Sequence, residues 1–294
     1  MYLKDNFTKE SDFDFRFNHN DTEMWPEPTT EMLDSFDQNG FVIVRDLFSP
    51  IEMEKMVKSI EGSNEFEKAN FAERDVHNRK IVQSNWNVPG EDILGMVARN
   101  AKVAGVAEQL MGHGDMYMYT GKVTMKKPKI GGEIVWHQDY GYYYNNHALF
   151  PDFINVLIGL TKSDHENGGL QVIKGSHHCG RIDHGKLVGQ THADLDRVNL
   201  ILKAQGLVEV NLRPGDAIFF HCNLLHRSGV NNSDHRRWNL IFTFNTMRNY
   251  HYRVDRKNGD MKIEAIDKVP ADAVKKVHNL KLQYRDYHVP DGSM

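Results

Sequence analysis

The spacing of the hydrophobic positions changes about one third of the way along the chain. In the first third, apolar residues recur every three or four positions over Thr29–Asn39, after Ser49-Pro50 and over Ile93–Met111. Residues at this spacing share one face of a helix, so three amphipathic helices are predicted, the first with Thr30 as its cap. The continuous β-branched run Phe41–Val44 predicts a buried strand. The amino-terminal third should therefore mix α and β structure.

From about Met116 onward, short apolar runs alternate with turn residues. Glycines in pairs or beside Asn, Lys or Pro mark these turns, as at Gly131-Gly132 and Pro214-Gly215. The strands predicted between the turns cover residues 116–125, 133–137, 155–160, 169–173, 207–211, 217–221 and 238–245. Many short strands at close intervals are typical of a sandwich or barrel. We expect a mainly β jelly-roll with flanking helices packed on one face.

No repeat, low-complexity tract or flexible linker divides the 294 residues, so one domain is expected. Within it, residues 1–28 are predicted to be an irregular arm and 29–115 a mixed α/β support. Residues 116–249 should form the jelly-roll core and 250–294 a carboxy-terminal extension.

Composition and charge limit the kinds of molecule that the protein is expected to bind. The formal net charge is −4, which offers no general attraction for nucleic acid or an anionic membrane. Only Cys179 and Cys222 are present, and the amino terminus lacks the apolar segment of a secretory signal. The longest apolar run, near Phe153–Leu160, is too short to span a bilayer. A cytoplasmic protein with a small-molecule substrate is expected.

The segment Trp136-His137-Gln138-Asp139 carries an imidazole and a carboxylate two residues apart. Alternate side chains of an extended segment share a face, so His137 and Asp139 can bind one cation together. His226, which follows the apolar run Ala217–Phe220, is the best candidate for a second imidazole. Two His and one carboxylate on one face of the metal suit Fe(II) and leave positions open for a co-substrate and O2.

Arg237 lies eleven residues after His226, at the start of an apolar strand. A buried guanidinium needs an anion, and its planar fork matches a carboxylate such as the distal one of 2-oxoglutarate. Ser228 can add a hydroxyl hydrogen bond to the same carboxylate. Arg236 is the alternative anchor, because strand alternation allows only one of the two arginines to face inward.

These motifs, taken in order, resemble the phytanoyl-CoA dioxygenase family, which includes ectoine hydroxylases. The resemblance covers the metal motif, Asn167–Leu170, Lys174–His177, Pro214–Gly229 and Arg237, and it spans roughly Phe36 to Phe244. It implies a double-stranded β-helix, also called cupin-like, in which His137, Asp139 and His226 bind Fe(II) while Arg237 and Ser228 anchor 2-oxoglutarate. It also implies that Gln138 lies behind the metal ligands or contacts the co-substrate.

Two positions depart from the family pattern. Leu157 stands where the phytanoyl-CoA member has an aromatic residue that contacts the co-substrate, and Thr124 aligns with an Asn of the ectoine hydroxylases. Lys122 and Thr124 are nevertheless expected to point into the barrel towards the co-substrate. The run Met125–Lys129 is interpreted as a solvated face that could also receive an acidic substrate.

Tyrosines follow the metal motif directly, at a place where family members line the substrate site. Tyr143 corresponds roughly to a substrate-contacting aromatic of the ectoine hydroxylases, and Tyr140 and Tyr142 are further candidates, with loop packing as the alternative. His177 and His178 are interpreted as structural. His221 is interpreted as a packed residue at a strand end, with substrate contact as the alternative.

The expected function is that of an Fe(II)/2-oxoglutarate-dependent dioxygenase that uses O2 and releases succinate and CO2. It would hydroxylate a small polar metabolite, such as an amino acid derivative or natural-product precursor, or else cyclise or desaturate it. Three alternatives remain: an acyl-CoA hydroxylase, for which Lys126, Lys127 and Lys129 could receive the phosphates, an inactive metal-binding sensing module, and a zinc hydrolase with the same three ligands. Arg237 argues against the sensing module and the zinc hydrolase.

Overall fold

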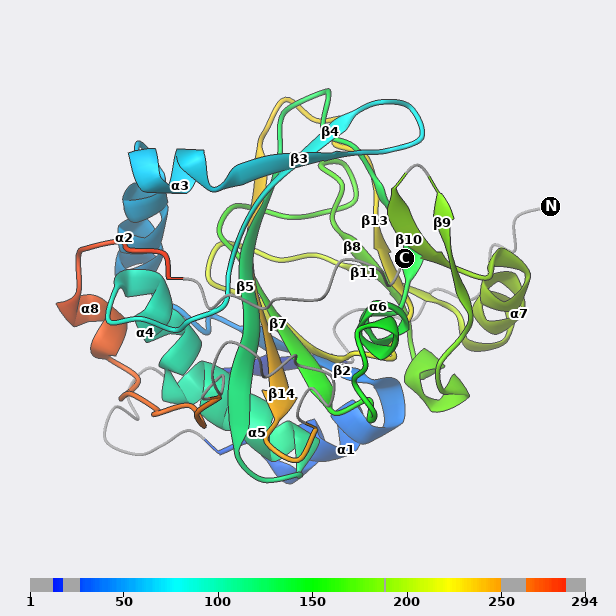
Figure 1. Cartoon of the computed structure of the whole chain (residues 1–294), viewed down its shortest axis with the longest axis horizontal. Coiled ribbons are helices and arrows are strands. Elements are labelled where there is room, and N and C mark those ends of the chain that lie inside the picture. Colours follow the sequence, from blue (N-terminus) through cyan, green and yellow to red (C-terminus); the bar gives the residue numbers. More distant parts are fainter. Residues whose placement is uncertain (1–12, 18–26, 188, 250–262, 284–294) are drawn as a thin grey trace, which may run out of the picture.

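The computed structural model describes residues 13–17, 27–187, 189–249 and 263–283. Within these residues the chain forms an eight-stranded sheet, a four-stranded sheet and a two-stranded hairpin. The large sheet has the order β1-β2-β12-β7-β14-β5-β4-β3, and the small sheet has the order β11-β8-β13-β6 (Figure 1). Figure 1 also shows long helices on one side of the large sheet and the small sheet on its other side.

The strands are β1 (Asp14–Arg16), β2 (Phe41–Arg45), β3 (Asn70–Arg74), β4 (Lys80–Trp86), β5 (Met116–Lys126), β6 (Ile134–His137), β7 (Phe153–Gly159), β8 (Leu170–Ile173), β9 (His184–Leu187), β10 (Gln190–Ala193), β11 (Leu207–Val210), β12 (Ala217–His221), β13 (His226–Ser228) and β14 (Arg237–Thr246). The α-helices are α1 (Thr30–Asn39), α2 (Pro50–Ile60), α3 (Asn64–Lys68), α4 (Ile93–Arg99), α5 (Val106–Met111), α6 (Asp139–Asn145), α7 (Leu195–Gln205) and α8 (Ala273–Lys276).

The two sheets face each other across a hydrophobic core. Leu157 on β7, Ile218 on β12 and Ile241 on β14 pack with Leu170 and Val172 of the small sheet. The neighbouring residues on the same strands point the other way because strand side chains alternate. This face-to-face packing of antiparallel sheets confirms the jelly-roll expectation.

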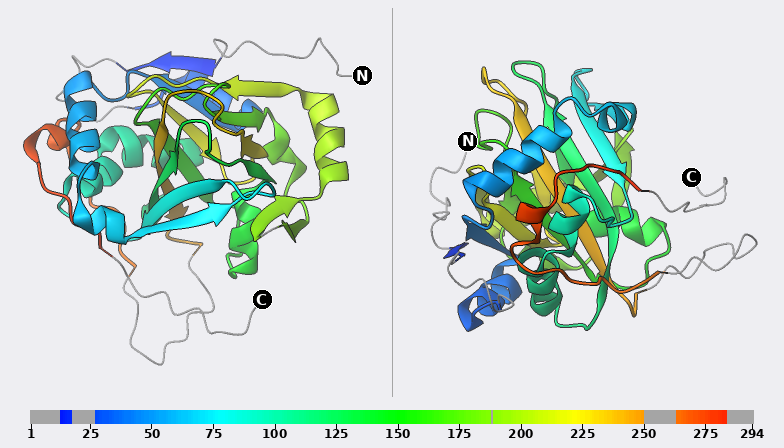
Figure 2. Two further views of the ribbon diagram at one scale, coloured as in Figure 1. Left: turned by 90° about the horizontal axis from the view of Figure 1, so that it is seen from above. Right: turned by 90° about the vertical axis from the view of Figure 1, so that its left-hand side faces the viewer.

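Helices cover the outer face of the large sheet. Val156, Phe219 and Phe242 lie in one cluster with apolar residues of α1, α2, α4 and α5. Figure 2 shows α2 and α8 on one flank of the molecule and α7 on the opposite flank. There, Val198 of α7 packs with residues of the small sheet. Among the described residues, the helices are too short or too polar for any of them to reach across a lipid bilayer.

The structure contains elements that were not predicted from the sequence, namely α3, α6, α7, α8, β3, β4, β9, β10 and β13. Three further details differ from the sequence-based expectation. Thr29, rather than Thr30, caps α1, since its Oγ1 accepts from the Met32 N–H at 3.3 Å. The expected helix over residues 93–111 is interrupted at Asn100, whose backbone is not helical (φ −58°, ψ 136°) and forms a bridge with Val269. It continues as a π-helical segment over Ala101–Gly105 and then as α5. The arm expected to be irregular contains β1, which pairs in parallel with β2. Most of the arm and of residues 250–294 lies outside the described residues.

Asp216 joins the predicted turn to the rest of the large sheet. Its buried carboxylate accepts from Arg45 Nη1 at 3.0 Å, from the Asp46 N–H at 2.9 Å and from the Arg213 N–H at 3.0 Å. Burial raises the pKa of this carboxyl, but the hydrogen bonds from the Asp46 N–H and from Arg213 outweigh it, and the pKa lies below its ordinary value.

The Asp216→Asn variant should therefore unfold more easily, by about 2 kcal/mol, because two arginines lose their buried anionic partner. A lowered carboxyl pKa contributes stability above its unfolded value, near pH 4, and that contribution is lost as the pH falls. The difference in free energy of unfolding between variant and wild type, measured with urea, should be about 2 kcal/mol at pH 7 and smaller near pH 3. The exposed Asp234→Asn serves as control; an equal loss in both variants would contradict the prediction.

Candidate active site

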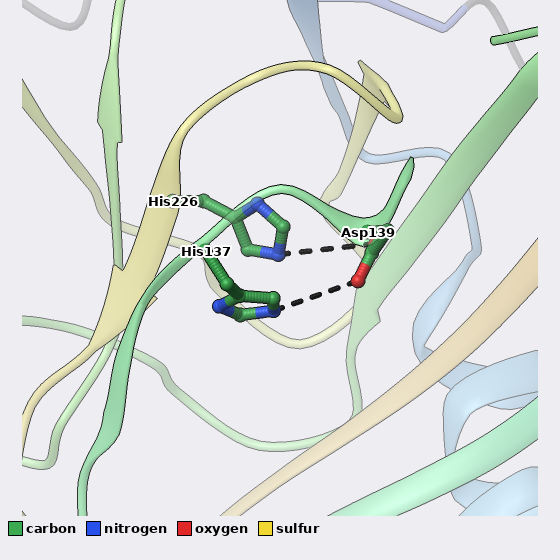
Figure 3. Close-up of side chains that lie close together, drawn as sticks. All are labelled: His137, Asp139 and His226. Atoms are coloured by element: carbon green, nitrogen blue, oxygen red, sulfur yellow. Dashed lines mark ion pairs between the residues drawn. The ribbon is translucent and has the colours of Figure 1, made fainter. Parts of the chain in front are cut away.

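Three elements bring His137, Asp139 and His226 together. His137 ends β6, Asp139 begins α6 two residues later, and His226 begins β13. Strand β13 lies between β6 and β8, so that His226 is directly opposite His137 in the ladder. His137 Nε2 lies 3.5 Å from Asp139 Oδ1, and His226 Nε2 lies 3.9 Å from Asp139 Oδ2 (Figure 3). One ligand atom of each residue lies within 4.8 Å of the others, a spacing that one metal ion could bridge.

The backbone orients both imidazoles. His137 Nδ1 lies 2.8 Å from the Val135 carbonyl oxygen, and His226 Nδ1 lies 2.9 Å from the Leu224 carbonyl oxygen. A carbonyl only accepts, so each Nδ1 carries a hydrogen, and Nε2 is the nitrogen available to a metal. The Nε2 atoms are the ones that point at Asp139 (Figure 3). This is the tautomer in which imidazoles ligate metals while a second hydrogen bond holds the ring.

The protonation states of His226 and Asp139 also favour binding of a cation. Burial, and after it the nearby His137, lowers the pKa of His226 to about 3, so its imidazole is neutral at physiological pH. Burial alone would raise the pKa of Asp139, but the neighbouring His226, His137 and Lys122 outweigh burial and hold this pKa below its ordinary value. Two imidazole nitrogens and one carboxylate form a donor set that fits Fe(II) with further positions left open.

A pocket of about 490 Å³, including its open mouth, adjoins this cluster. Besides the three candidate ligands, four of its wall residues were expected from the sequence to serve the co-substrate, namely Lys122, Thr124, Ser228 and Arg237. The other lining residues are Ile134, Leu157, Leu170, Phe220, Arg227 and Ile241.

Arg237 is a buried cation on the pocket wall. It is 2% exposed, and burial lowers its pKa to about 10, which leaves it charged at neutral pH. When the Asn239 side-chain amide is oriented with its oxygen towards Arg237, this oxygen accepts a hydrogen bond from Arg237 Nη1 at 2.6 Å. Among the described residues, Nε and Nη2 of Arg237 have no hydrogen-bond partner, and neither does Thr124 Oγ1. Buried donors of this kind require an acceptor, and a carboxylate fits the guanidinium fork.

Arg236 faces away from the pocket, as strand alternation predicts. Its guanidinium forms an ion pair with Glu61 and lies 4.2 Å from the centre of the Trp238 ring. Arg237, and not Arg236, is therefore in a position to reach a co-substrate.

Lys126 is a cation that sequence reasoning missed. The run 125–129 was interpreted as a solvated face, yet Lys126 is fully buried and lies opposite Arg237 in the β5–β14 ladder. Its Nζ donates to Ser228 Oγ at 2.8 Å, to the Gly168 carbonyl at 3.4 Å and to the Gly229 carbonyl. Alternation along β5 was the available signal, since Lys126 is two residues from the inward-facing Thr124.

Gln138 does not contact the pocket, which corrects one of the two roles expected for it. Its amide donates to the Gly180 carbonyl at 2.8 Å and the Asn223 carbonyl at 2.7 Å, and its oxygen accepts from the Ile182 N–H at 2.7 Å. The side chain is thus fully occupied by backbone groups. Because Asn223 lies three residues before His226, Gln138 ties together the two segments that carry the candidate ligands.

The tyrosines also differ from the expectation that they line the substrate site. Tyr140 is buried, and its hydroxyl donates to the Leu149 carbonyl at 2.8 Å. Tyr143 is buried against Phe153, and its hydroxyl lies 3.4 Å from Thr243 Oγ1. Tyr142 is 48% exposed. None of the three lines the pocket, because α6 turns their side chains into packing or solvent.

His177 and His221 lie outside this pocket, in agreement with their structural interpretation. His177 Nε2 is 2.9 Å from the Asp37 carbonyl oxygen. His221 ends β12 and accepts from the Asn223 N–H at 3.0 Å. Burial, and after it the nearby His177, lowers the pKa of His221 to about 3. Neither residue lines the pocket.

The chain is similar in sequence to known proteins. Residues 36–238 match the family model for phytanoyl-CoA dioxygenase. An L-proline trans-4-hydroxylase of Streptomyces griseoviridis is 30% identical over 54% of this chain, a match that spans 65% of the hydroxylase, a little under two thirds of its length. An ectoine dioxygenase of Bordetella parapertussis is 27% identical over 75% of this chain and 76% of its own length.

Solved structures show the same fold. EctD from S. alaskensis, crystallised with 2-oxoglutarate and 5-hydroxyectoine, is 19% identical, covers 88% of this chain and 93% of its own, and has a TM-score of 0.66. The carbocyclase SnoK from nogalamycin biosynthesis is 20% identical over 74% of this chain and 84% of its own, with a TM-score of 0.60. The family model covers well over half of the chain, and the chain therefore belongs to the phytanoyl-CoA dioxygenase family of non-haem iron, 2-oxoglutarate-dependent oxygenases.

Proposed function

We propose that the protein oxidises a small polar metabolite with O2 and 2-oxoglutarate, and that His137, Asp139 and His226 hold the iron. The observation that carries this proposal is Arg237, a buried guanidinium whose Nε and Nη2 lack partners among the described residues and which shares a pocket with the three ligands. When bound, the iron supplies O2 activation coupled to the conversion of 2-oxoglutarate into succinate and CO2. One oxygen atom enters succinate and the other oxidises the substrate.

The polar end of the pocket is built to receive a carboxylate. The three acceptors around Lys126 Nζ match the three N–H bonds of an ammonium group. Because Ser228 Oγ accepts from Lys126, the hydroxyl hydrogen of Ser228 is free to point at a ligand. Arg237, Ser228 and Thr124 can then donate together to the distal carboxylate of 2-oxoglutarate.

Lys126→Met should raise the 2-oxoglutarate concentration needed for half-maximal turnover by about tenfold, because a buried cation next to the carboxylate is lost. Burial, and after it repulsion by Arg237, holds the pKa of Lys126 well below its ordinary value, and a dianionic co-substrate would offset that repulsion. Lys127→Met, at the exposed neighbouring position, is the matched control. Equal requirements in both variants would exclude Lys126 from co-substrate binding.

The basic run offers little support for an acyl-CoA substrate. Lys126 is buried, and Lys129 is paired with Asp234 at 3.2 Å and with the Asn232 carbonyl at 3.0 Å. Of the three expected phosphate contacts, only Lys127 is exposed and has no hydrogen-bond or ion-pair partner among the described residues. A small polar metabolite is favoured instead by the polar residues Lys122 and Arg227 on the pocket wall and by the relatives named for L-proline and ectoine.

The deciding experiment supplies the purified protein with Fe(II), ascorbate and 2-oxoglutarate and measures succinate with and without O2. The panel contains free amino acids, cyclic amino acid derivatives and one acyl-CoA, and mass spectrometry reports gain of oxygen, ring closure or loss of two hydrogens. Oxygen-dependent succinate that rises with one panel member supports the proposal. Binding of 2-oxoglutarate without turnover would favour a sensing module, and hydrolysis that depends on Zn(II) alone would favour a hydrolase.

A further inference from the structure

A chain of buried polar side chains leads away from the candidate metal ligand Asp139. Asn155 Nδ2 donates to Asp139 Oδ2 at 2.8 Å, and Thr243 Oγ1 donates to Asn155 Oδ1 at 2.6 Å. The Tyr143 hydroxyl lies 3.4 Å from Thr243 Oγ1. Asn155 and Thr243 are each 1% exposed and Tyr143 is 5% exposed. Neither Asn155 nor Thr243 was among the residues that the sequence suggested for the site.

The direction of each hydrogen bond in this chain follows from its neighbour. A carboxylate only accepts, so the Asn155 amide must present its nitrogen to Asp139 and its oxygen to Thr243. The single hydroxyl hydrogen of Thr243 is then given to Asn155. Tyr143 must in turn be the donor to Thr243, and its hydroxyl is the outer end of this chain of hydrogen bonds.

The strands hold this arrangement in place. Asn155 on β7 and Thr243 on β14 are direct register partners in the large sheet. Strand β14 also carries Arg237, and side chains two residues apart on a strand share a face, so both residues belong to the inward-facing row. The amide of Asn155 is therefore fixed by the same sheet that fixes the pocket.

We propose that Asn155 is a positioning residue that holds Asp139 Oδ2, so that Oδ1 is the oxygen offered to the metal, and that Thr243 and Tyr143 orient Asn155. A carboxylate can bind a metal through one or both oxygens. If Asp139 bound through both, it would occupy a further position on the ion, and the function proposed above needs that position for the co-substrate or O2. This inference rests on the same metal site as the proposed function.

The test compares Co(II) binding by the full chain without O2, using the affinity and the visible spectrum of the bound ion. Asn155→Leu keeps the volume but removes the donor, and should weaken Co(II) binding by about 10- to 100-fold and change the intensity of its visible bands. Thr243→Val should also weaken Co(II) binding, but by less. Thr243→Ser should bind Co(II) as the wild type does, because serine keeps the hydroxyl.

Tyr140→Phe is the matched control, since it also removes a buried hydroxyl bond from α6 but lies outside this chain of contacts. If Asn155→Leu does not fold, the comparison of Thr243→Val with Thr243→Ser still tests the inference. Wild-type affinity and spectrum in Thr243→Val would overturn the inference. Weakened Co(II) binding in the variants would uphold it even if the wild-type protein turned over no 2-oxoglutarate, a result that would count against the proposed function alone.

Discussion

Replacing His226 with alanine should abolish 2-oxoglutarate turnover and weaken metal binding by more than about 100-fold. Loss of a metal ligand costs more affinity than loss of a residue that only orients a ligand. His226 supplies one of only two imidazole nitrogens in the cluster, and its ring is already held by Leu224 in the ligating tautomer. Anaerobic titration with Co(II) measures the binding, and succinate formation measures the turnover.

His177→Ala is the control for this variant, because His177 is partly buried and bonded to the backbone but lies outside the pocket. It should bind Co(II) as the wild type does. If His226→Ala kept wild-type affinity, the ligand set would be wrong and the proposed function would lose its metal site.

Replacing Arg237 with methionine should raise the 2-oxoglutarate requirement by about 100-fold, with metal affinity unchanged. A charged hydrogen bond contributes about 1.5–3 kcal/mol, and 1.4 kcal/mol corresponds to a factor of ten. Methionine keeps much of the side-chain length but removes the fork. Succinate formation measured against 2-oxoglutarate concentration gives the requirement, and Co(II) titration gives the metal affinity.

Arg236→Met provides the matched control one residue away. Its guanidinium points outward to Glu61, so this variant should need no more 2-oxoglutarate than the wild type does. A raised requirement in Arg236→Met but not in Arg237→Met would mean that the other register of the strand carries the anchor.

The sequence by itself determined the features that depend on local patterns. Strands β5, β6, β7, β8, β11, β12 and β14 could be predicted because apolar runs and glycine turns reflect backbone preferences over a few residues, whereas the short strands β9, β10 and β13 were not predicted. The alternation that directs Arg237 inward and Arg236 outward is equally local. The spacing of His137 and Asp139 also suggested a shared cation, although Asp139 begins a helix rather than continuing the strand.

The tertiary structure alone decided which side chains meet across strands that are distant in the sequence. Lys126 belongs to a basic run, but its register opposite Arg237 buries it behind Ser228. Tyr143 follows the metal motif, but it packs against Phe153 and ends the hydrogen-bonded chain to Asp139 rather than facing a substrate. Local patterns report which face of an element is apolar, whereas long-range strand register decides which polar groups share that face, and so which of them can act together.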